Sequence, residues 1–540
     1  MSNLSFIREP FTERERAILS NYFTNTDKPV FGLINLPDVV KGALFARYSR
    51  SDKSLRRLFL DEFWIDTPDS AGTCTTGGLN TERAGRLYDK MILDFGDDSV
   101  AQLGGAHLAC EQVSNLLAKF IEKGRIASYL EQSTRYVYYN RKREGRYGYL
   151  TSPEIESSSC CALYREFMDA LFDTYTDLQQ RLIPVFRERY PRTEGMTDGA
   201  WENTIKAKAC DTIRGLLPAS TRTNLGIFAN GQYYEYLLIK MFASRNREVL
   251  AYADMMLTEL RKMIPSFLTR VDLENRGRAW SRYLSDIGDD MERFVPQPGA
   301  VLPASPQPNT VELVGWDPDA VRRIVRAILY EYSDRSKTQL DQTVSRLTEP
   351  ELGQIVRAYC GERLNRRHKP GRAFEAASYE FDLLSDYGAF RDIQRHRMLT
   401  IDWQRLTTDN GYFKPAILEE LPAEGALYDG ILRRAQQVFE TLRRELGPDT
   451  AQYAVPFAFR LRYAITMNLR EAFHLIELRT QRQGHDSYRR ICLRMYELMR
   501  DRAGHGLLTD GMLFVDDNFY DLARAEAEKR KSAKKGNNGT

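Results

Sequence analysis

Hydrophobic side chains recur at helical spacing over much of this chain. The run Leu163 to Tyr190 carries apolar residues three or four positions apart, which predicts one long amphipathic helix. Asn203 to Leu217 predicts a second helix, which Pro218 would end. Apolar and charged residues alternate at helical period through residues 224 to 268 as well. The pattern therefore predicts that helices dominate the first part of the chain.

Shorter segments extend this pattern. Val113 to Ile121 fits either a helix or a strand, whereas residues 69 to 81 are rich in Gly, Ser and Thr, which predicts a loop. We expect a fold of the α+β class that is predominantly helical. The other segments with helical periodicity are Leu55 to Phe63, Glu82 to Phe95, Asp319 to Leu329, Gln339 to Leu347 and Pro350 to Leu364.

A proline-rich stretch divides the chain. Residues 295 to 310 carry five prolines and no charged side chain, a composition typical of an extended, semi-rigid connector. We therefore predict one half at residues 1 to 294 and a second at 311 to 523. Residues 524 to 540 are too polar to bury a core, which predicts a disordered basic tail.

Composition narrows the class of protein. Lys and Arg number 77 against 74 Asp and Glu, a formal net charge of +3, and 42% of the 540 residues are hydrophobic. These values are ordinary for a soluble protein and favour neither nucleic-acid nor membrane binding. Seven cysteines form no disulfide framework or C-x-x-C pattern, and no stretch has about eighteen consecutive apolar residues. We expect a cytoplasmic protein.

Polar chemistry is densest between Arg125 and Tyr136, which read R-I-A-S-Y-L-E-Q-S-T-R-Y. This density favours a ligand site over a structural turn. The segment resembles the signature of the flavin-dependent thymidylate synthases, R-H-R-x-x-S-x-x-E-x-S-x-R-Y, although Lys123 and Gly124 stand where that family has Arg-His. The residues in register are Arg125, Ser128, Glu131, Ser133, Arg135 and Tyr136.

The second half carries the part that the first half lacks. Arg395-His396-Arg397 is an intact R-H-R, but the positions after it do not continue the signature. Arg214 to Pro218 resembles the family's R-x-x-L-P, and Gln452 to Pro456 keeps the proline but not the arginine. Each half therefore retains what the other has lost, which indicates a tandem duplication.

An asparagine stands twelve residues beyond each proline, Asn230 in the first half and Asn468 in the second. The sequence from Asn468, N-L-R-E-A-F-H-L-I-E-L-R, is similar to the family's N-A-R-x-x-x-(N/H)-x-x-x-L-R. Three positions of that motif carry an arginine, an asparagine or histidine, and a second arginine. In the first half these positions are Gln232, Tyr236 and Met241. Their second-half counterparts are Arg470, His474 and Arg479.

The resemblance implies an active site assembled between subunits of a homotetramer. One type of hybrid site would use both sets of residues, and the reciprocal type would have neither. The implied flavin contacts are Ser49, Ser99, Arg395, His396, Arg397, Asn468, Arg470 and His474. The implied nucleotide contacts are Glu131, Ser133, Arg135, Arg214 and Arg479, and the implied catalytic residues are Asp97, Ser133 and Arg479.

The residue types suit these roles. A nucleotide monophosphate is a dianion, and planar guanidiniums bind such oxygens through paired donors. Two positions depart from the family: Asp97 replaces a histidine and Asp392 replaces a glutamine. A carboxylate can act as a base, but it only accepts hydrogen bonds where an amide also donates. Glu471-x-x-His474 resembles half of a di-iron motif, and without a second such motif we expect no metal.

The leading hypothesis is a thymidylate synthase-like enzyme of this flavin-dependent type. It would methylate dUMP to dTMP with FAD as cofactor and with methylenetetrahydrofolate and NADPH as co-substrates. Two halves per chain imply a homodimer that mimics a tetramer. One alternative keeps flavin and nucleotide but changes the reaction. Another is a non-catalytic nucleotide-binding or scaffold protein.

Overall fold

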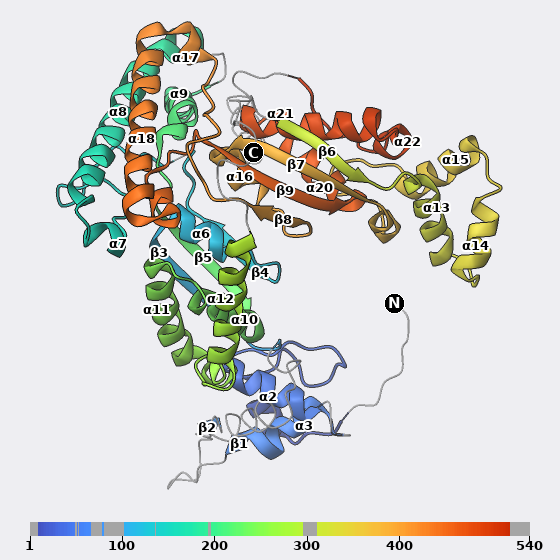
Figure 1. Ribbon diagram of the computed structural model, residues 1–540. Coiled ribbons are helices and arrows are strands. Elements are labelled where there is room, and N and C mark those ends of the chain that lie inside the picture. Colours follow the sequence, from blue (N-terminus) through green and yellow to red (C-terminus); the bar gives the residue numbers. More distant parts are fainter. Residues whose placement is uncertain are drawn as a thin grey trace. The chain divides into compact units, whose positions relative to one another are not determined.

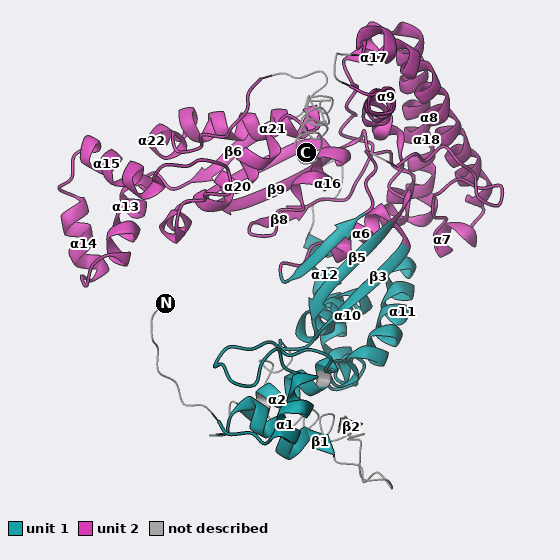
Figure 2. Cartoon of the chain, turned by 180° about the vertical axis from the view of Figure 1, so that it is seen from behind, with its two compact units in different colours: residues 1–111, 126–131, 224–300 teal, residues 112–125, 132–223, 301–540 magenta. Residues whose placement is uncertain are grey.

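The computed structural model describes residues 9–48, 51, 53–65, 78–79, 102–135, 137–192, 196–294 and 310–518 (Figure 1). The chain forms two compact units, coloured separately in Figure 2. Unit 1 comprises residues 1–111, 126–131 and 224–300, and unit 2 comprises 112–125, 132–223 and 301–540. Unit 2 thus takes residues from both predicted halves. The compact units and the two halves are different divisions of the chain, and the boundaries of the halves remain a prediction. Residues 295–309 of the predicted connector at 295–310 and the whole predicted tail lie outside the described residues, whereas Thr310 begins a strand.

Unit 1 combines helices with two small sheets. β3 and β5 are included here, although residues 112–114 and 222–223 at their ends are assigned to unit 2. Its strands are β1 (Trp64–Ile65), β2 (Gly78–Leu79), β3 (Gly105–Ser114), β4 (Ala127–Glu131) and β5 (Arg222–Asn230). Its helices are α1 (Glu13–Ser20), α2 (Asp38–Tyr48), α3 (Leu55–Leu58), the π-helix Phe59–Phe63, α10 (Gly231–Phe242), α11 (Arg247–Met263), the 3₁₀ turn Pro265–Leu268 and α12 (Gly277–Phe294).

Strand β5 lies at the centre of a three-stranded sheet in the order β3-β5-β4. It pairs antiparallel with β4, with Ala127 opposite Ala229 and Glu131 opposite Leu225. The prediction of helical structure from residue 224 onwards is therefore wrong up to Asn230 and confirmed in α10 and α11. Leu225, Ile227 and Ala229 are buried at a period of two, which is the pattern of a strand with one face on a core.

Unit 2 holds a four-stranded sheet in the order β6-β7-β9-β8 and a group of long helices. Its strands are β6 (Thr310–Trp316), β7 (Ser378–Asp386), β8 (Thr400–Trp403) and β9 (Arg460–Asn468). Its first helices are α6 (Asn115–Ile121), α7 (Pro153–Glu156), α8 (Cys161–Arg189), α9 (Asp198–Ile213) and the 3₁₀ turn Arg214–Leu216. The helices of its later part are α13 (Ala320–Glu331), α14 (Lys337–Val344), α15 (Glu349–Cys360), the 3₁₀ turn Arg372–Ala376, α16 (Tyr387–Ile393), α17 (Ile417–Glu420), α18 (Pro422–Leu446), α19 (Pro448–Ala451), the 3₁₀ turn Gln452–Ala454, α20 (Leu469–Arg479), α21 (Asp486–Glu497), the π-helix Leu498–Arg502 and α22 (Gly506–Thr509).

A single hydrophobic core runs through unit 2 and joins parts of both halves. The long helices α8 and α18 pack side by side, with α9 against α8 (Figure 1). Leu171 and Leu178 of α8 and Leu432 and Phe439 of α18 belong to the same buried cluster. The predicted helix over Leu163 to Tyr190 is confirmed as α8, because its apolar stripe faces this core.

The two halves repeat the same succession of elements. In each half a strand and short helix (β3-α6, β7-α16) lead to a second strand (β4, β8) and a long helix (α8, α18). Next come a 3₁₀ turn, a nine-residue strand (β5, β9) and a helix (α10, α20). The sheet orders β3-β5-β4 and β7-β9-β8 also correspond. These matches confirm the tandem arrangement.

The repeats meet in unit 2 at their two prolines. Pro218 and Pro456 form an antiparallel bridge. The Ala219 amide donates to the Val455 carbonyl at 2.8 Å, and the Phe457 amide donates to the Leu217 carbonyl at 2.9 Å. Each bond is the counterpart of the other under exchange of the halves, as at a two-fold interface between identical subunits.

None of the helices in the described part of the chain is long and apolar enough to cross a membrane.

Candidate active site

Two helix starts in unit 2 position the R-H-R segment and its partner helix. Asp386 caps α16 by accepting a 2.8 Å hydrogen bond from the Ala389 amide. Asn468 caps α20 in the same way, through a 2.9 Å bond from the Glu471 amide. Such side-chain acceptors satisfy amides that the first helical turn leaves without partners. The chain leaves α16 after Ile393, and His396 then enters the protein interior, where it is 3% exposed.

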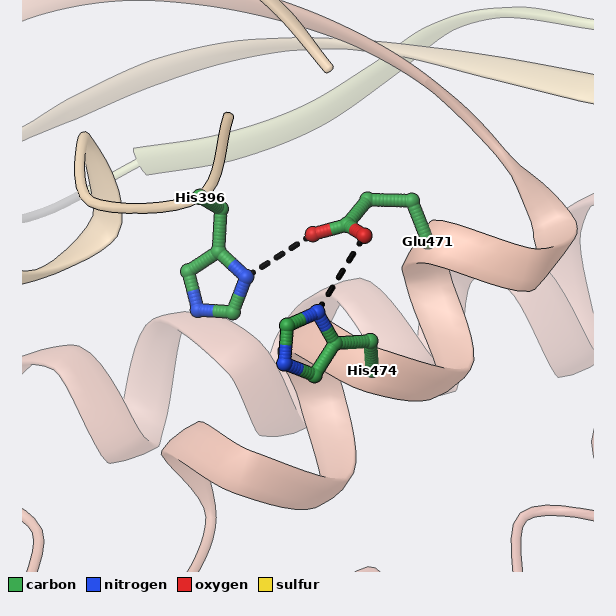
Figure 3. Close-up of side chains that lie close together, drawn as sticks. All are labelled: His396, Glu471 and His474. Carbon is green, nitrogen blue, oxygen red and sulfur yellow. Dashed lines mark hydrogen bonds and ion pairs between the residues drawn. The ribbon is translucent and has the colours of Figure 1, made fainter. Parts of the chain in front are cut away.

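His396, Glu471 and His474 form a hydrogen-bonded triad (Figure 3). The Glu471 carboxylate lies 2.8 Å from His396 Nδ1 and 3.2 Å from His474 Nδ1. An ionised carboxylate only accepts, so both imidazoles donate through Nδ1. His396 Nε2 then accepts a 3.0 Å hydrogen bond from Arg479 Nε. The triad therefore fixes the tautomer of His396 and the orientation of the Arg479 guanidinium.

The protonation states agree with this arrangement. Burial lowers the pKa of His396 to about 4, so the ring is neutral near pH 7. Burial alone would raise the pKa of Glu471, but hydrogen bonds from His396 and His474 outweigh it and lower that pKa to about 2. Glu471 is thus ionised, as its role as a double acceptor requires.

The same triad has the composition of a metal site. Its ligand atoms lie within 4.8 Å of one another, and two histidines with one carboxylate can hold a divalent ion. However, both nitrogens of His396 are already hydrogen-bonded, and the Arg479 guanidinium beside it would repel a cation. We therefore interpret the triad as a hydrogen-bonded support for Arg479.

A second network joins the predicted nucleotide arginines. Arg135 binds Asp211 through two hydrogen bonds, Nε to Oδ1 at 2.8 Å and Nη2 to Oδ2 at 2.9 Å. Asp392 lies 3.4 Å from Nη1 of Arg214 and 3.7 Å from Nη1 of Arg479. Arg214 also lies 4.0 Å from Asp211. These three arginines and two aspartates form what we call the arginine cluster, which Arg479 joins to the triad.

The arginine cluster keeps a positive excess. Burial would raise the pKa of Asp392, but Arg214 and Arg479 lower it to about 2. Burial would likewise raise the pKa of Asp211, but the charges around it, chiefly that of Arg135, hold this pKa well below its ordinary range. Both carboxylates are therefore ionised, so the three guanidiniums of the cluster face its two negative charges. Buried Asp386 also interacts with Arg214, and burial raises the pKa of its carboxyl group. The cluster can accept an anionic group.

One donor in the arginine cluster has no hydrogen-bond partner. Nη2 of Arg214 is buried and makes no hydrogen bond within the part of the chain that the structure describes. The Arg214 side chain is 5% exposed, and a buried donor left unsatisfied costs free energy. Such a group is stabilised when a ligand oxygen accepts from it.

The structure brings together five of the predicted residues: Arg135, Arg214 and Arg479 in the arginine cluster, and His396 and His474 in the triad. Ser133 lies close to Arg135, whose amide donates to its hydroxyl at 3.3 Å. Glu131 is the last residue of β4 in unit 1.

The other predicted flavin contacts hold different positions in unit 2. Arg470 Nε donates to the Pro370 carbonyl at 3.0 Å, and Arg397 Nη1 lies 3.5 Å from the Arg125 carbonyl. Arg395 is exposed, and the side chain of Asn468 serves as the cap of α20. Four residues of the motifs, Ser49, Asp97, Ser99 and Tyr136, lie outside the described residues.

Three residues of the networks had no predicted site role. Asp211 and Glu471 supply the carboxylates that bind Arg135 and His396, and Tyr488 lies 3.4 Å from Arg135 Nη1 with its ring beneath Arg479. Asp211 and Glu471 each stand three positions before a predicted site residue in the sequence. That i, i+3 spacing is the signal that could have identified them.

Comparisons with known proteins extend over nearly the whole chain. A family model described as "Thymidylate synthase complementing protein" matches residues 52–266 and 312–503. A UPF0159 protein of Chlamydia pneumoniae is 38% identical over 529 residues, which cover 97% of this chain and 98% of that protein. UPF0159 protein Ta1429 of Thermoplasma acidophilum is 31% identical over 526 residues, covering 92% and 99%.

Two other matches cover one part of the chain. A flavin-dependent thymidylate synthase of Clostridium tetani is 23% identical over 190 residues, 35% of this chain and 70% of that enzyme. The crystal structure of the UMP/dUMP methylase PolB from Streptomyces cacaoi, bound with 5-Br dUMP, covers 38% of this chain and 98% of its own. That match has 16% identity and a TM-score of 0.30, too low to support a conclusion about this chain.

Proposed function

The chain belongs to the thymidylate synthase complementing protein family, which is the family of flavin-dependent thymidylate synthases that its motifs resemble, and we therefore propose that it is a flavin-dependent nucleotide methylase. It converts dUMP to dTMP, with methylenetetrahydrofolate as the carbon donor and NADPH as the reductant. The working site uses the arginine cluster and the triad of unit 2, which combine residues of both halves.

The observation that carries this proposal is the buried, unpartnered Nη2 of Arg214. A phosphate oxygen is a strong acceptor, and a guanidinium in a partly buried site binds it through a charge-assisted hydrogen bond. Arg135 and Arg479 lie in the same cluster and add two further fixed positive charges. The substrate monophosphate therefore binds here.

The triad positions Arg479 for this task. Glu471 holds the proton of His396 on Nδ1, and Nε2 of His396 then holds Arg479 Nε. The Nη groups of Arg479 remain directed toward Asp392 and the substrate. Arg479 is thus pre-organised before the nucleotide binds, which reduces the entropy lost on binding.

The residues present also fit a flavin dinucleotide. Arg395 and Arg397 belong to the R-H-R segment and Arg470 to α20, and the two segments are joined by the His396–Glu471 hydrogen bond. The three residues supply guanidiniums for a diphosphate. His474 uses Nδ1 for Glu471, and its Nε2 makes no hydrogen bond among the described residues, so it can accept from the cofactor. FAD, when bound, supplies hydride transfer, which no side chain of the protein can perform.

The test is a visible absorption spectrum of the purified protein after incubation with FAD, followed by titration with dUMP. We expect a flavin spectrum that shifts when dUMP binds, and dTMP when methylenetetrahydrofolate and NADPH are added. Arg214→Lys keeps the charge but loses the planar fork, so the dissociation constant for dUMP rises by roughly 30-fold while FAD still binds.

Two further variants complete the test. Arg470→Ala should weaken FAD binding, because its guanidinium is assigned to the cofactor. Arg181→Ala removes an arginine of α8 that is 47% exposed and pairs with Asp177, so it should change neither ligand's binding. Absence of flavin after incubation with excess FAD would contradict the proposal and favour a scaffold protein.

A second candidate keeps both ligands but changes the base. Asp392 stands where the family has glutamine, and as an ionised carboxylate it only accepts hydrogen bonds. A base with an exocyclic amine, as in cytosine, can donate to it. A spectral shift with dCMP at lower concentration than with dUMP would favour this candidate.

We also propose that the protein is a homodimer. Two chains supply the four repeats that the family's homotetramer has. Light scattering should give twice the chain mass of 62.3 kDa. A single species of monomer mass would contradict this assembly.

A further inference from the structure

Unit 1 contains a pocket at the position that corresponds, in the first repeat, to the triad. The pocket has a volume of about 520 Å³ and opens along α10. This size falls in the ordinary range of small-molecule sites, roughly 300 to 1,000 Å³. Its lining residues are Ile126, Asn230, Gln232, Tyr233, Glu235, Tyr236, Ile239, Arg270, Arg276, Gly277 and Trp280.

The repeat explains why this pocket cannot bind the same ligands as the proposed active site. Gln232 and Tyr236 of α10 occupy the positions of Arg470 and His474 in α20, and Tyr233 occupies that of Glu471. Met241, at the position of Arg479, is fully buried. The two arginines assigned to a diphosphate and a phosphate dianion are therefore absent from α10, where Gln232 and Met241 stand instead, and tyrosines replace Glu471 and His474.

Aromatic surface dominates the mouth of the pocket. The rings of Tyr236 and Trp280 lie 5.4 Å apart, and the two side chains are 37% and 43% exposed. Ile126, at the same rim, is 70% exposed. Exposed apolar side chains gathered in one concave place are typical of a binding site. The ammonium of Lys240 lies over one face of the Tyr236 ring, 4.0 Å from its centroid. The remaining surface of the two neighbouring rings favours a flat, aromatic ligand that stacks on it.

The polar groups of the pocket specify the ligand's charge. Arg270 is held by Glu235 through two hydrogen bonds of 2.8 and 2.6 Å, so these charges cancel. Arg276 is exposed and makes no side-chain hydrogen bond or ion pair within the described part of the chain. The lining therefore carries one uncompensated positive charge, which matches a single carboxylate better than a phosphate dianion.

The backbone fixes Arg276 at this rim. A Cβ on Gly277 would lie 2.0 Å from the Val271 carbonyl oxygen, so the loop before α12 packs directly against the helix start. Gln232 contributes a further group: its carbonyl accepts from Gln102 at 2.9 Å, and its side-chain amide protons make no hydrogen bond within the described residues. The pocket thus combines a stacking surface, an amide donor and one guanidinium.

We propose that this pocket binds a planar heteroaromatic molecule that carries one carboxylate. The rings stack on Tyr236 and Trp280, the carboxylate pairs with Arg276, and the Gln232 amide donates to a ring nitrogen or carbonyl. The site is separate from the arginine cluster and does not depend on the reaction proposed there.

Pterin-6-carboxylic acid, a planar pteridine that carries one carboxylate, is a suitable probe. We would measure its binding to the full-length protein, with and without added FAD and dUMP, by isothermal titration calorimetry. We expect one site per chain, and a dissociation constant about tenfold higher in Arg276→Ala and in Tyr236→Ala. Arg282→Ala is the matched control, because Arg282 is a 59% exposed arginine of α12, the helix that begins directly after Arg276, and it pairs with Glu274, so its loss should have no effect.

Two variants separate this site from the proposed active site. Trp280→Phe keeps a stacking ring, so binding should persist while quenching of tryptophan fluorescence by the probe is reduced. Arg470→Ala should leave binding of pterin-6-carboxylic acid unchanged. The proposal is overturned if the probe does not bind at millimolar concentration, if Arg276→Ala and Tyr236→Ala bind it as tightly as the unaltered protein, or if Arg470→Ala abolishes binding.

Discussion

Asp392 sets the charge of the arginine cluster. Its carboxylate stands between Arg214 and Arg479, and those two cations keep its pKa near 2. A neutral amide, which the family has at this position, would leave both guanidiniums free to bind a ligand anion. A substrate phosphate must therefore compete with Asp392 for Arg214 and Arg479.

Asp392→Asn should tighten nucleotide binding and weaken the fold. Removing the competing charge lowers the dissociation constant for dUMP by about tenfold, and the cluster's self-repulsion lowers the melting temperature of the ligand-free protein. Calorimetric titration and thermal unfolding measure the two effects. Asp409→Asn, which removes an exposed partner of Arg443, is the control and should change neither. Weaker dUMP binding in Asp392→Asn would show that the carboxylate itself contacts the substrate.

His396 should make stability depend on pH in a defined window. Its folded pKa is about 4, whereas in the unfolded chain it titrates near 6.5. Between these values the unfolded chain binds a proton that the folded chain does not, so the free energy of unfolding falls as pH falls from 6.5 to 4. The slope for one such group is about 1.4 kcal/mol per pH unit. Half-buried His485, whose pKa is lowered to about 3 chiefly by desolvation, acts in the same direction.

Thermal unfolding of His396→Asn between pH 4 and 6.5 measures this contribution. The melting temperature should fall less steeply with acid than in the unaltered protein, because the variant has no imidazole to protonate at this position. His107→Asn is the control, since His107 is exposed on β3. An unchanged slope in His396→Asn would mean that His396 takes up its proton equally in the folded and unfolded chains.

At the scale of elements, both halves contain the same unit of a strand, a capping asparagine and a helix. β5 leads into α10 and β9 into α20, and in both the asparagine accepts a 2.9 Å bond from the amide three positions on. A lost cap costs about 1 kcal/mol wherever it occurs. The two helices differ in the residues that follow, which carry charge in α20 and aromatic rings in α10.

Asn468→Ala and Asn230→Ala form a matched pair. Each should lower the free energy of unfolding by about 1 kcal/mol, because each removes the same capping bond. Only Asn468→Ala should weaken FAD binding, since α20 carries Arg470 and His474. Thermal unfolding and flavin absorbance measure the two effects. Equal FAD binding in both variants would restrict Asn468 to capping.

At the scale of the whole molecule, the compact units do not follow the two halves of the sequence. Unit 2 takes α8 and α9 from the first half and builds them into one core with α18 and the second-half sheet. The Pro218–Pro456 bridge lies inside the same unit. Neither half contains all of the apolar surface that this core needs.

Residues 1–294 and 311–540 expressed as separate polypeptides test this dependence. Each alone should aggregate, because α8 or α18 would expose the face that it buries against the other. Expressed together, they should purify as one complex and recover the melting transition of the intact chain. A soluble, cooperatively unfolding 311–540 fragment would contradict a shared core.

Local sequence was sufficient where a regular pattern decides the structure. The apolar stripe of α8 and the helical periods of α13 and α15 predicted those elements, because a helix buries one face by spacing alone. β7 and β9 went unpredicted because one strand's register depends on its partners, which are distant in sequence. Arg135, Arg214, His396 and Arg479 were identified from motifs, which record residue identity directly.

The sequence by itself determined the repeat and the family, and it predicted the arginines of the candidate site. Only the tertiary structure decided their partners: Asp211 meets Arg135 across 76 residues, and Glu471 meets His396 across 75. It also decided that one core would draw on both halves, and that the reciprocal position would become an aromatic pocket. The physical reason is distance along the chain. Helix periods and caps act within a few residues, whereas ion pairs, cores and pockets form only when folding brings remote segments together.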